Sequence, residues 1–304
     1  MRPTLRPGDK RRARYPPPRM QRRDVVQEGD ARLRAFLAED LGSGDVTSDT
    51  TVPEAARAEG ELVARSETVV SGLDTARRVF ELLEPGLAWN PSCSAGERAS
   101  AGSVLARLSG AARPILAAER VALNLLQRMC GIATATRRFV DAVAGTGCRI
   151  LDTRKTAPGL RVFDREAVRD GGGTNHRFDL SSMVLIKDNH RRLAGGVASA
   201  VAAARAKAPP ETRVEVEVES ESELRDALAA GADWILIDNQ TPETVARWCA
   251  IARASQQPPF LEASGNVRLE NVRAYAEAGA DAVSVGALTH SVRAADVSLE
   301  LTTK

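Results

Sequence analysis

Apolar residues recur along the first half of the chain with two different spacings. From Val25 to Leu41 they follow a helical stripe, which ends at the stop signal Gly42-Ser43-Gly44. The next predicted elements are short β-type runs at 60–70 and 103–108, a helix at 73–83 and a long helix at 114–143, in which Gly131 is a candidate break. Short strands mixed with helices are typical of a small α+β unit.

After residue 143 the pattern changes to short apolar runs that alternate with helix-like stretches. The predicted strands lie at 148–151, 183–186, 214–218, 234–237, 260–261 and 282–285. The predicted helices lie at 193–207, 221–230, 241–254 and 269–278. This alternation predicts a parallel sheet or an α/β barrel, and six strands do not require a complete eight-stranded barrel.

Composition and charge separate the N-terminal residues from the rest. With 43% hydrophobic and 27% charged residues, the chain has an ordinary folded composition, and no apolar run is long enough for a membrane span. Residues 1–23 contain nine basic and one acidic residue, a charge of +8, whereas the remainder carries −6. We expect 1–23 to be a disordered basic extension, with Met20 as a second possible start. A nucleic-acid-binding arm is the alternative.

The four cysteines form no metal-binding pattern. Cys93, Cys130, Cys148 and Cys249 contain no CxxC spacing. They are typical of small buried side chains in a protein of the reducing cytoplasm.

Polar residues follow nearly every strand of the second half. After the successive strands come Asp152, Thr153, Arg154 and Lys155; Lys187, Asp188 and Asn189; Glu217 and Glu219; Asp238 and Asn239; Glu262, Ser264 and Gly265; and Gly286. Sites in parallel α/β folds are built at the carboxyl ends of the strands. We therefore expect one shared pocket.

The expected pocket is basic, although the body around it is acidic. Its predicted cations are Arg154, Lys155, Arg161, His176, Arg177 and Lys187, joined by Arg120 from the preceding helix. The chain has only five lysines, so Lys155 and Lys187 stand out among the many arginines. A compact ammonium suits phosphate or carboxylate, and such a pocket indicates a multiply anionic ligand.

Two glycine turns next to late strands add a phosphate signal. They are Ser264-Gly265-Asn266 and Gly286-Ala287-Leu288. Glycines there allow backbone N–H groups to approach a phosphate. The run Gly171-Gly172-Gly173 is interpreted instead as a loop that positions His176 and Arg177.

The segment Arg213–Glu219 alternates strictly, so Glu215, Glu217 and Glu219 share one face of a strand. Carboxylates packed together require cations. Glu217 with Asp238 could hold Mg²⁺ partly through substrate oxygens, or the carboxylates could pair with Lys155 or Lys187; both arrangements can hold together.

Eight long motifs identify a resemblance. They are EDLGSGDVTSD at 39–49, ERVALNLLQRMCGIAT at 119–134, LDTRKTAPGLR at 151–161, GGGTNHRFDLSSMVLIKDNH at 171–190, VEVEVES at 214–220, ILIDN at 235–239, EASGN at 262–266 and SVGALTHS at 284–291. The chain resembles the quinolinate phosphoribosyltransferase family, also called nicotinate-nucleotide pyrophosphorylase (carboxylating), over nearly all of 24–304.

The resemblance implies an α/β protein of two parts. An N-terminal open-faced α/β sandwich would span 24–130, with the tail 292–304 packing back on it. An incomplete parallel α/β barrel would form the catalytic domain at 131–291. A cytoplasmic homodimer, or a larger assembly of dimers, is implied, with Arg120 contributed across the interface.

The resemblance also implies the reaction. Quinolinate and 5-phosphoribosyl-1-pyrophosphate would give nicotinate mononucleotide, CO₂ and pyrophosphate with Mg²⁺, in de novo NAD biosynthesis. The implied catalytic residues are Lys155, Lys187, Glu217 and Asp238, the last two also holding Mg²⁺. The implied substrate-binding residues are these four with Arg120, Thr153, Arg154, Arg161, His176, Arg177, Ser264, Gly265, Asn266, Val285, Gly286 and Ala287, of which 264–266 and 285–287 would hold the 5′-phosphate.

The sequence leaves three other functions open. A related phosphoribosyltransferase could act on another anionic ring, such as nicotinate. A barrel lyase could use Lys155 or Lys187 as a Schiff-base nucleophile, but that lysine must lose its proton, which carboxylates such as Glu217 oppose. A nucleic-acid-binding function of 1–23 would leave the polar strand ends unexplained, so neither nucleic acid nor membrane is an expected partner.

Overall fold

A computed structural model describes residues 22–303, and it describes the side chains of 29–302. These residues group into two compact units. The first comprises 138–154 and 174–286, and the second comprises 22–137, 155–173 and 287–303. The expected basic extension lies outside the described residues, apart from Arg22 and Arg23, with which the first helix begins.

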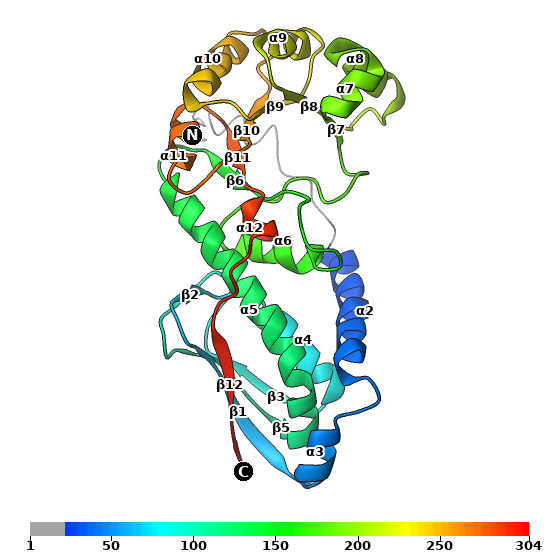
Figure 1. Ribbon diagram of the computed structural model, residues 1–304, viewed down its shortest axis with the longest axis vertical. Helices are drawn as coiled ribbons and strands as arrows, with labels where there is room; N and C mark the ends of the chain where they lie inside the picture. The colour runs from blue at the N-terminus through cyan, green and yellow to red at the C-terminus, as the bar shows by residue number, and fades with distance from the viewer. Residues whose placement is uncertain (1–21, 304) are drawn as a thin grey trace, which may run out of the picture. The chain divides into compact units, whose positions relative to one another are not determined.

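The second unit contains an antiparallel sheet and several helices (Figure 1). In chain order its elements are α2 (Arg22–Leu41), α3 (Val46–Thr51), β1 (Arg57–Ala64), β2 (Thr68–Val69), α4 (Leu73–Leu83), β3 (Ala88–Pro91), β4 (Arg98–Ala99), β5 (Val104–Ala111), α5 (Ala112–Ala142, which enters the first unit at Arg138), α6 (Arg161–Asp170), α12 (Ala287–His290) and β12 (Val297–Thr303). Among the described residues, the larger sheet has the order β12-β1-β5-β3, and β2 pairs with β4.

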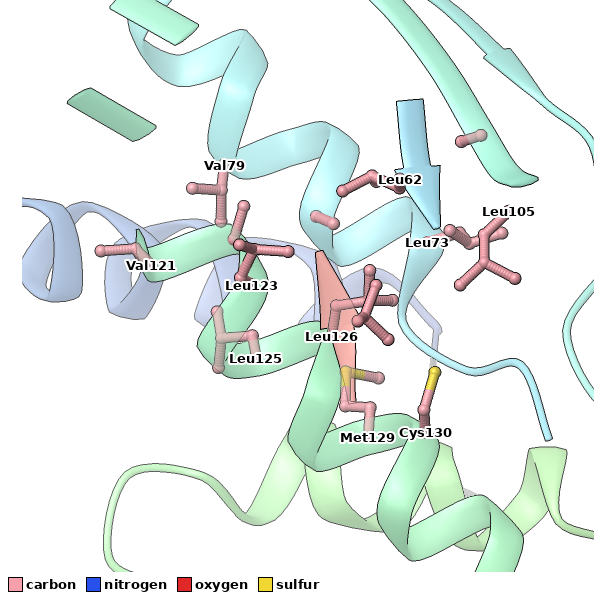
Figure 2. Packing of buried hydrophobic residues seen from close by; sticks show 14 of the residues in the cluster. Leu62, Leu73, Val79, Leu105, Val121, Leu123, Leu125, Leu126, Met129 and Cys130 are labelled. Atoms are coloured by element: carbon pink, nitrogen blue, oxygen red, sulfur yellow. The ribbon is translucent and has the colours of Figure 1, made fainter. Parts of the chain in front are cut away.

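One face of the larger sheet is apolar and the other is polar. Leu62 of β1 and Leu105 of β5 are fully buried in the same cluster as Leu126 of α5 (Figure 2). On the opposite face, Arg107 Nε lies 2.8 Å from the exposed Glu61 Oε1. A sheet with helices on one face and a polar surface on the other is an open-faced sandwich.

The end of the chain returns to the second unit. β12 pairs antiparallel with β1, from Ala64↔Val297 to Ala58↔Thr303. The preceding segment passes so close to α5 that a Cβ on Gly131 would lie 2.2 Å from Arg293 O. The predicted break at Gly131 is wrong, because α5 is continuous. Glycine is needed at this position because any side chain would collide with the passing segment.

The first unit is built on a parallel sheet. In chain order its elements are β6 (Arg149–Leu151), β7 (Val184–Ile186), α7 (Asp188–Ala194), α8 (Val197–Lys207), β8 (Val214–Val218), α9 (Glu221–Ala229), β9 (Trp234–Asp238), α10 (Pro242–Arg253), β10 (Phe260–Ser264), α11 (Val272–Glu277) and β11 (Ala282–Ser284). Within the described residues six strands have the order β6-β11-β10-β9-β8-β7, and all neighbours are parallel. The sheet does not close on itself, so the barrel is incomplete and the expected α/β fold class is confirmed.

Two similar turns lead into β9 and β11 of this sheet. Asp233 Oδ2 accepts a hydrogen bond from Val214 N–H at 2.8 Å, and Asp281 Oδ2 accepts one from Leu261 N–H at 2.9 Å. The repeated AGAD sequence therefore joins the start of one strand to the start of its neighbour, which helps to align their carboxyl ends.

Several short elements differ from the predicted pattern. The β-type run at 60–70 divides into β1 and β2, and α3, α6, α7, β3, β4, α12 and β12 were not predicted. Within residues 22–303, no helix is long and apolar enough to cross a membrane.

Candidate active site

The carboxyl ends of the parallel strands bring many of the predicted site residues to one edge of the first unit. Thr153 and Arg154 follow β6, and Lys187 follows β7. Asp238 closes β9 directly beside Ser264 of β10 in the register of the sheet. The expected polar edge is therefore present in this unit.

Each carboxylate on the inner face of β8 has a different basic partner. His176 Nε2 lies 3.0 Å from Glu215 Oε2. Lys187 Nζ donates to Glu217 Oε2 at 2.8 Å. Pairing each buried acid with a neighbouring base allows these two like charges to share one strand face.

The pair Lys187–Glu217 lies at the carboxyl ends of β7 and β8. The Glu217 side chain is 8% exposed, whereas that of Lys187 is 47% exposed. The Lys187 ammonium can therefore meet a ligand from solvent while Glu217 holds it in place. The interpretation of Glu217 as an ion-pair partner of Lys187 agrees with this contact.

Asp238 stands beside Glu217 in a partly buried position. Burial raises the pKa of Asp238, and the negative charge of Glu217 raises it further. Asn239 Nδ2 donates to Asp238 Oδ2 at 2.6 Å. Two carboxylates whose charges oppose each other fit a divalent cation, which would relieve that repulsion, so the donors suit Mg²⁺.

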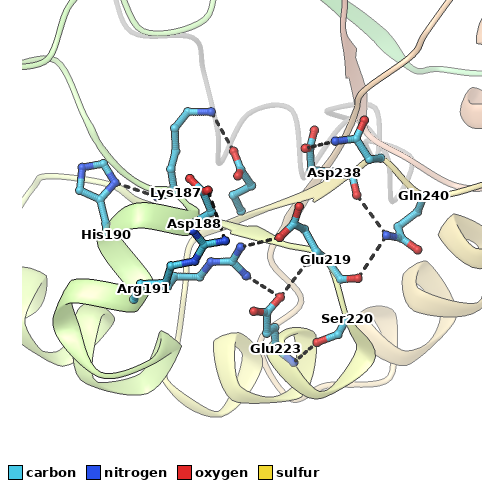
Figure 3. A network of polar contacts seen from close by, with 12 residues as sticks. Lys187, Asp188, His190, Arg191, Glu219, Ser220, Glu223, Asp238 and Gln240 are labelled. Atoms are coloured by element: carbon cyan, nitrogen blue, oxygen red, sulfur yellow. Dashed lines mark hydrogen bonds and ion pairs between the residues drawn. The ribbon is translucent and has the colours of Figure 1, made fainter.

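A neighbouring network, which the sequence did not reveal, neutralises Glu219. Arg191 of α7 is 6% exposed, and its Nη2 donates to Glu219 Oε2 at 3.0 Å while its Nη1 pairs with Glu223. Figure 3 shows Arg191 between these two acids. Glu219 is therefore an anchor for α7, and its charge is not left for a metal.

His176 lies below this edge, in the interior of the first unit. Asp152 Oδ1 accepts from His176 N–H at 2.7 Å, and Asp152 Oδ2 accepts from Asn175 Nδ2 at 2.6 Å. Burial lowers the pKa of His176 and attraction to Glu215 and Glu262 raises it, while the Arg177 N–H that donates to Nδ1 opposes a second ring proton. The sequence predicts His176 as a pocket cation and Glu262 as a polar strand-end residue, but it gives no signal that the two side chains meet.

Arg177 is buried, with its guanidinium near a second one. Its Nη1 donates to Met183 O at 3.0 Å. Burial lowers the pKa of Arg177, and repulsion from Arg154 lowers it further. An anion bound close to both arginines would relieve this repulsion, which agrees with the expected anionic ligand.

The turn at Gly265 requires glycine. Its φ is +91°, and a Cβ would lie 2.2 Å from Asn239 Oδ1 and 2.7 Å from Asn239 N. Asn239 itself has φ +53° and donates its N–H to Ser264 O at 2.9 Å. Glycine at 265 therefore accommodates the close approach of Asn239, which the sequence marks only as a polar strand-end residue. Its lack of a side chain is also a property of phosphate-binding turns.

The second expected phosphate turn is used partly by the sheet. Val285 is buried, and its N–H donates to Leu151 O at 3.0 Å. The Val285 amide therefore extends the pairing of β11 with β6. Gly286 ends the first unit, and Ala287 begins α12.

The remaining predicted site residues lie in the second unit. Arg120 is exposed on α5, where its Nη2 lies 3.8 Å from Glu119 Oε1. Arg161 opens α6 and donates from Nε to Thr156 Oγ1 at 3.1 Å. Lys155 is exposed, and its carbonyl accepts from Thr289 Oγ1 at 2.9 Å.

An incomplete parallel barrel with cations, carboxylates and a glycine turn at its strand ends defines an α/β enzyme that handles anionic substrates. The chain matches the family models for the quinolinate phosphoribosyl transferase N-terminal domain over residues 45–130 and C-terminal domain over residues 132–300. The chain therefore belongs to the quinolinate phosphoribosyltransferase family.

Named relatives agree with this assignment. The nicotinate-nucleotide pyrophosphorylase (carboxylating) of Mycobacterium leprae is 44% identical over 277 residues, which cover 88% of this chain and 95% of that protein. The chloroplastic enzyme of the same name from Arabidopsis thaliana is 39% identical over 290 residues, covering 90% and 83%. A solved nicotinate-nucleotide pyrophosphorylase from Francisella tularensis superposes with a TM-score of 0.87 at 36% identity, covering 95% of this chain and 100% of that one.

Proposed function

We propose that this chain transfers the phosphoribosyl group of 5-phosphoribosyl-1-pyrophosphate to quinolinate, with loss of CO₂. The products are nicotinate mononucleotide, CO₂ and pyrophosphate, as in NAD biosynthesis. The observation that carries the proposal is the strand edge of the first unit, where Lys187, Arg154 and Arg177 accompany the bare turn at Gly265. Family membership and the names of the relatives supply the reaction.

The reaction needs fixed positive charge at two places. Quinolinate brings two carboxylates, for which Arg154 and Arg177 are the proposed ligands. The departing pyrophosphate gains charge as the C1–O bond breaks, and the Lys187 ammonium can stabilise that charge. By their positions in the family motifs, we propose an anion-binding role also for Arg120, Lys155, Arg161 and Thr153.

The ribosyl centre becomes cationic as the bond to pyrophosphate breaks. Glu217 and Asp238 can stabilise this charge or accept hydrogen bonds from the ribose hydroxyls. The ring nitrogen of quinolinate then forms the new bond to C1 and becomes positive. When the adjacent carboxylate leaves as CO₂, its electron pair stays on ring carbon C2, where the positive nitrogen stabilises it until a proton from solvent forms the C2–H bond. No covalent enzyme intermediate is required.

Mg²⁺ is the proposed cofactor, with Glu217 and Asp238 as its protein donors. When bound, it would neutralise part of the charge on the pyrophosphate group. The raised pKa of Asp238, due to burial and then to Glu217, supports a cation beside these two carboxylates. Ser264, Gly265 and Asn266 are the proposed ligands of the 5′-phosphate, together with Val285, Gly286 and Ala287.

We further propose a cytoplasmic homodimer in which Arg120 reaches the partner's site. The exposure of Arg120 on α5 supports this role. Cys93, Cys130, Cys148 and Cys249 are free thiols, and burial raises the pKa of Cys148 and of Cys249 to about 12, which suits unreactive cysteines of a reducing compartment.

The direct test gives the purified protein 5-phosphoribosyl-1-pyrophosphate and Mg²⁺ with either quinolinate or nicotinate. We expect nicotinate mononucleotide from quinolinate at a kcat/KM at least about a hundredfold above that for nicotinate, because a site built for two carboxylates leaves cations unpaired with one. Turnover of nicotinate alone would identify the related activity on another ring instead. The Schiff-base alternative is disfavoured because Glu217 holds Lys187 as an ion pair.

A further inference from the structure

A cluster of polar groups is buried beneath the polar strand edge of the first unit. Glu215 of β8 is 0% exposed and Glu262 of β10 is 1% exposed. His176 Nε2 lies 3.0 Å from Glu215 Oε2 and 3.3 Å from Glu262 Oε2. Buried charges are costly unless their partners are well placed, so this arrangement calls for a reason other than stability.

The backbone fixes which ring nitrogen of His176 carries the proton. Arg177 N–H donates to His176 Nδ1 at 2.7 Å. A ring nitrogen that accepts a hydrogen bond has no proton of its own. The two carboxylates favour a second ring proton, but on Nδ1 it would meet the Arg177 N–H, so the single proton lies on Nε2 and faces Glu215 and Glu262.

The same three residues are metal-ligating groups whose donor atoms all lie within 4.8 Å of one another. A metal on Nε2 needs the lone pair of that nitrogen and therefore a proton on Nδ1. Because Nδ1 accepts from Arg177, the geometry favours two hydrogen-bond acceptors around Nε2–H over a metal site.

The surroundings hold the cluster in place. Ser284 Oγ donates to Glu262 Oε1 at 2.5 Å and so orients that carboxylate. The Trp234 ring meets the His176 ring edge to face, with centroids 5.6 Å apart, and Trp234 packs on Phe260 at 4.3 Å. The imidazole is thus held between carboxylates and an aromatic wall, and it is not free to turn.

We propose that Glu215 and Glu262 are positioning residues, which accept Nε2–H of His176 and thereby hold Nδ1 against the backbone of Arg177. The Arg177 guanidinium is then fixed for a carboxylate of the ring substrate. This last step rests on the proposed function, in which Arg177 binds quinolinate. His176 acts through Arg177, since both of its ring nitrogens face groups of this chain.

The first test reads the His176 ring directly and does not depend on activity. Protein with ¹⁵N-labelled histidine has three imidazoles, His176, His190 and His290, and His176→Asn assigns the signal of interest. At pH 7 we expect His176 with Nε2 protonated and Nδ1 bare. A proton on Nδ1, either as the other tautomer or as imidazolium, would overturn the proposal. So would a switch to the Nδ1–H tautomer on addition of Zn²⁺ or Mn²⁺.

The second test separates the acceptor role from general packing. Glu262→Gln keeps an acceptor oxygen, whereas Glu262→Leu keeps the volume but accepts nothing. Relative to wild type we expect Glu262→Leu to raise KM for quinolinate about tenfold or more, with KM for 5-phosphoribosyl-1-pyrophosphate changed less than about threefold. Glu262→Gln should stay within about threefold for both substrates.

The control is Val283→Ala, which truncates a fully buried side chain of the neighbouring strand β11. It should lower the melting temperature without moving KM for quinolinate or the His176 signal. Equal effects of Glu262→Gln and Glu262→Leu, or an equal rise of both KM values, would contradict the positioning role. A wild-type protein inactive on quinolinate would defeat the proposed function, while the ring signal would still decide the tautomer.

Discussion

The two large sheets of this molecule bury side chains of different chemical character. The antiparallel sheet of the second unit buries Leu62 and Leu105 against Leu126 of α5. The parallel sheet of the first unit buries Glu215, Glu217 and Glu262 as well as apolar side chains. Apolar burial stabilises a fold, whereas buried carboxylates cost free energy that their partners only partly offset. The contrast indicates that the first interior is shaped by chemistry and the second by stability.

The largest effect on catalysis, which we assign to the first unit, should come from Lys187→Ala. It removes the exposed ammonium and leaves Glu217 without its partner, so we expect kcat/KM to fall about a hundredfold to a thousandfold, with a cooperative unfolding transition retained. Steady-state kinetics and thermal unfolding measure the two quantities. The matched control is Lys207→Ala at an exposed position of α8, which should keep wild-type kinetics. Near-normal kcat/KM in Lys187→Ala would show that Lys187 is not the central cation of the site.

The corresponding variant in the second unit is Leu126→Ala, which should affect stability and not catalysis. Leu126 is fully buried, and its truncation should lower the free energy of unfolding by about 2–5 kcal/mol. Because Leu126 is a core residue and not a proposed ligand, kcat per folded molecule should be unchanged. Denaturant unfolding and active-site-normalised kinetics check both halves. As a control, Leu193→Ala at a 90% exposed position should change stability by less than about 0.5 kcal/mol.

A smaller and more selective effect is expected from Gly265→Ala. The added Cβ must displace Asn239, and the residue must keep a φ of +91°. We expect KM for 5-phosphoribosyl-1-pyrophosphate to rise about tenfold to a hundredfold, with KM for quinolinate little changed, since only the phosphate turn is distorted. If both KM values rose equally, the turn would not be a phosphate site.

The smallest effect concerns pH and Asp238. The pKa of Asp238 is raised in the folded protein, by burial first and by Glu217 second, so the folded state holds its proton to a higher pH than the unfolded state. The stability of wild type relative to Asp238→Asn should therefore fall as pH rises from the ordinary carboxyl range through the raised pKa, by less than about 1 kcal/mol. Denaturant unfolding from pH 4 to pH 7 measures this. A relative gain of stability over that range would reverse the assigned direction.

Elements with a regular pattern could be predicted from the sequence. The helix predicted at 73–83 is α4, and each of the six predicted strands of the parallel sheet is present. Elements without such a pattern could not. The sequence of α6 is rich in charged residues and shows no clear apolar pattern. Its Asp164 is nevertheless fully buried and accepts two hydrogen bonds from Arg128 of α5. β12 exists because it pairs with β1, more than 230 residues away.

The candidate site divides in the same way. The strand-end position of Lys187 and the shared face of Glu215 and Glu217 could be predicted from the sequence, because side chains alternate along a strand with a fixed period. The contacts of Arg191 with Glu219, and of His176 with Glu262, join residues about 30 and 90 positions apart. Only the register of the sheet brings such residues together, and a single sequence does not carry that register.

The measurement that tests the account most directly is release of CO₂ from carboxyl-labelled quinolinate by wild type, Lys187→Ala and Lys207→Ala, each with Mg²⁺ and with or without 5-phosphoribosyl-1-pyrophosphate. We expect CO₂ release only when the phosphoribosyl donor is present. The rate should be normal in Lys207→Ala and at least about a hundredfold slower in Lys187→Ala. No release by the folded wild-type protein, or equal release by both variants, would contradict the account.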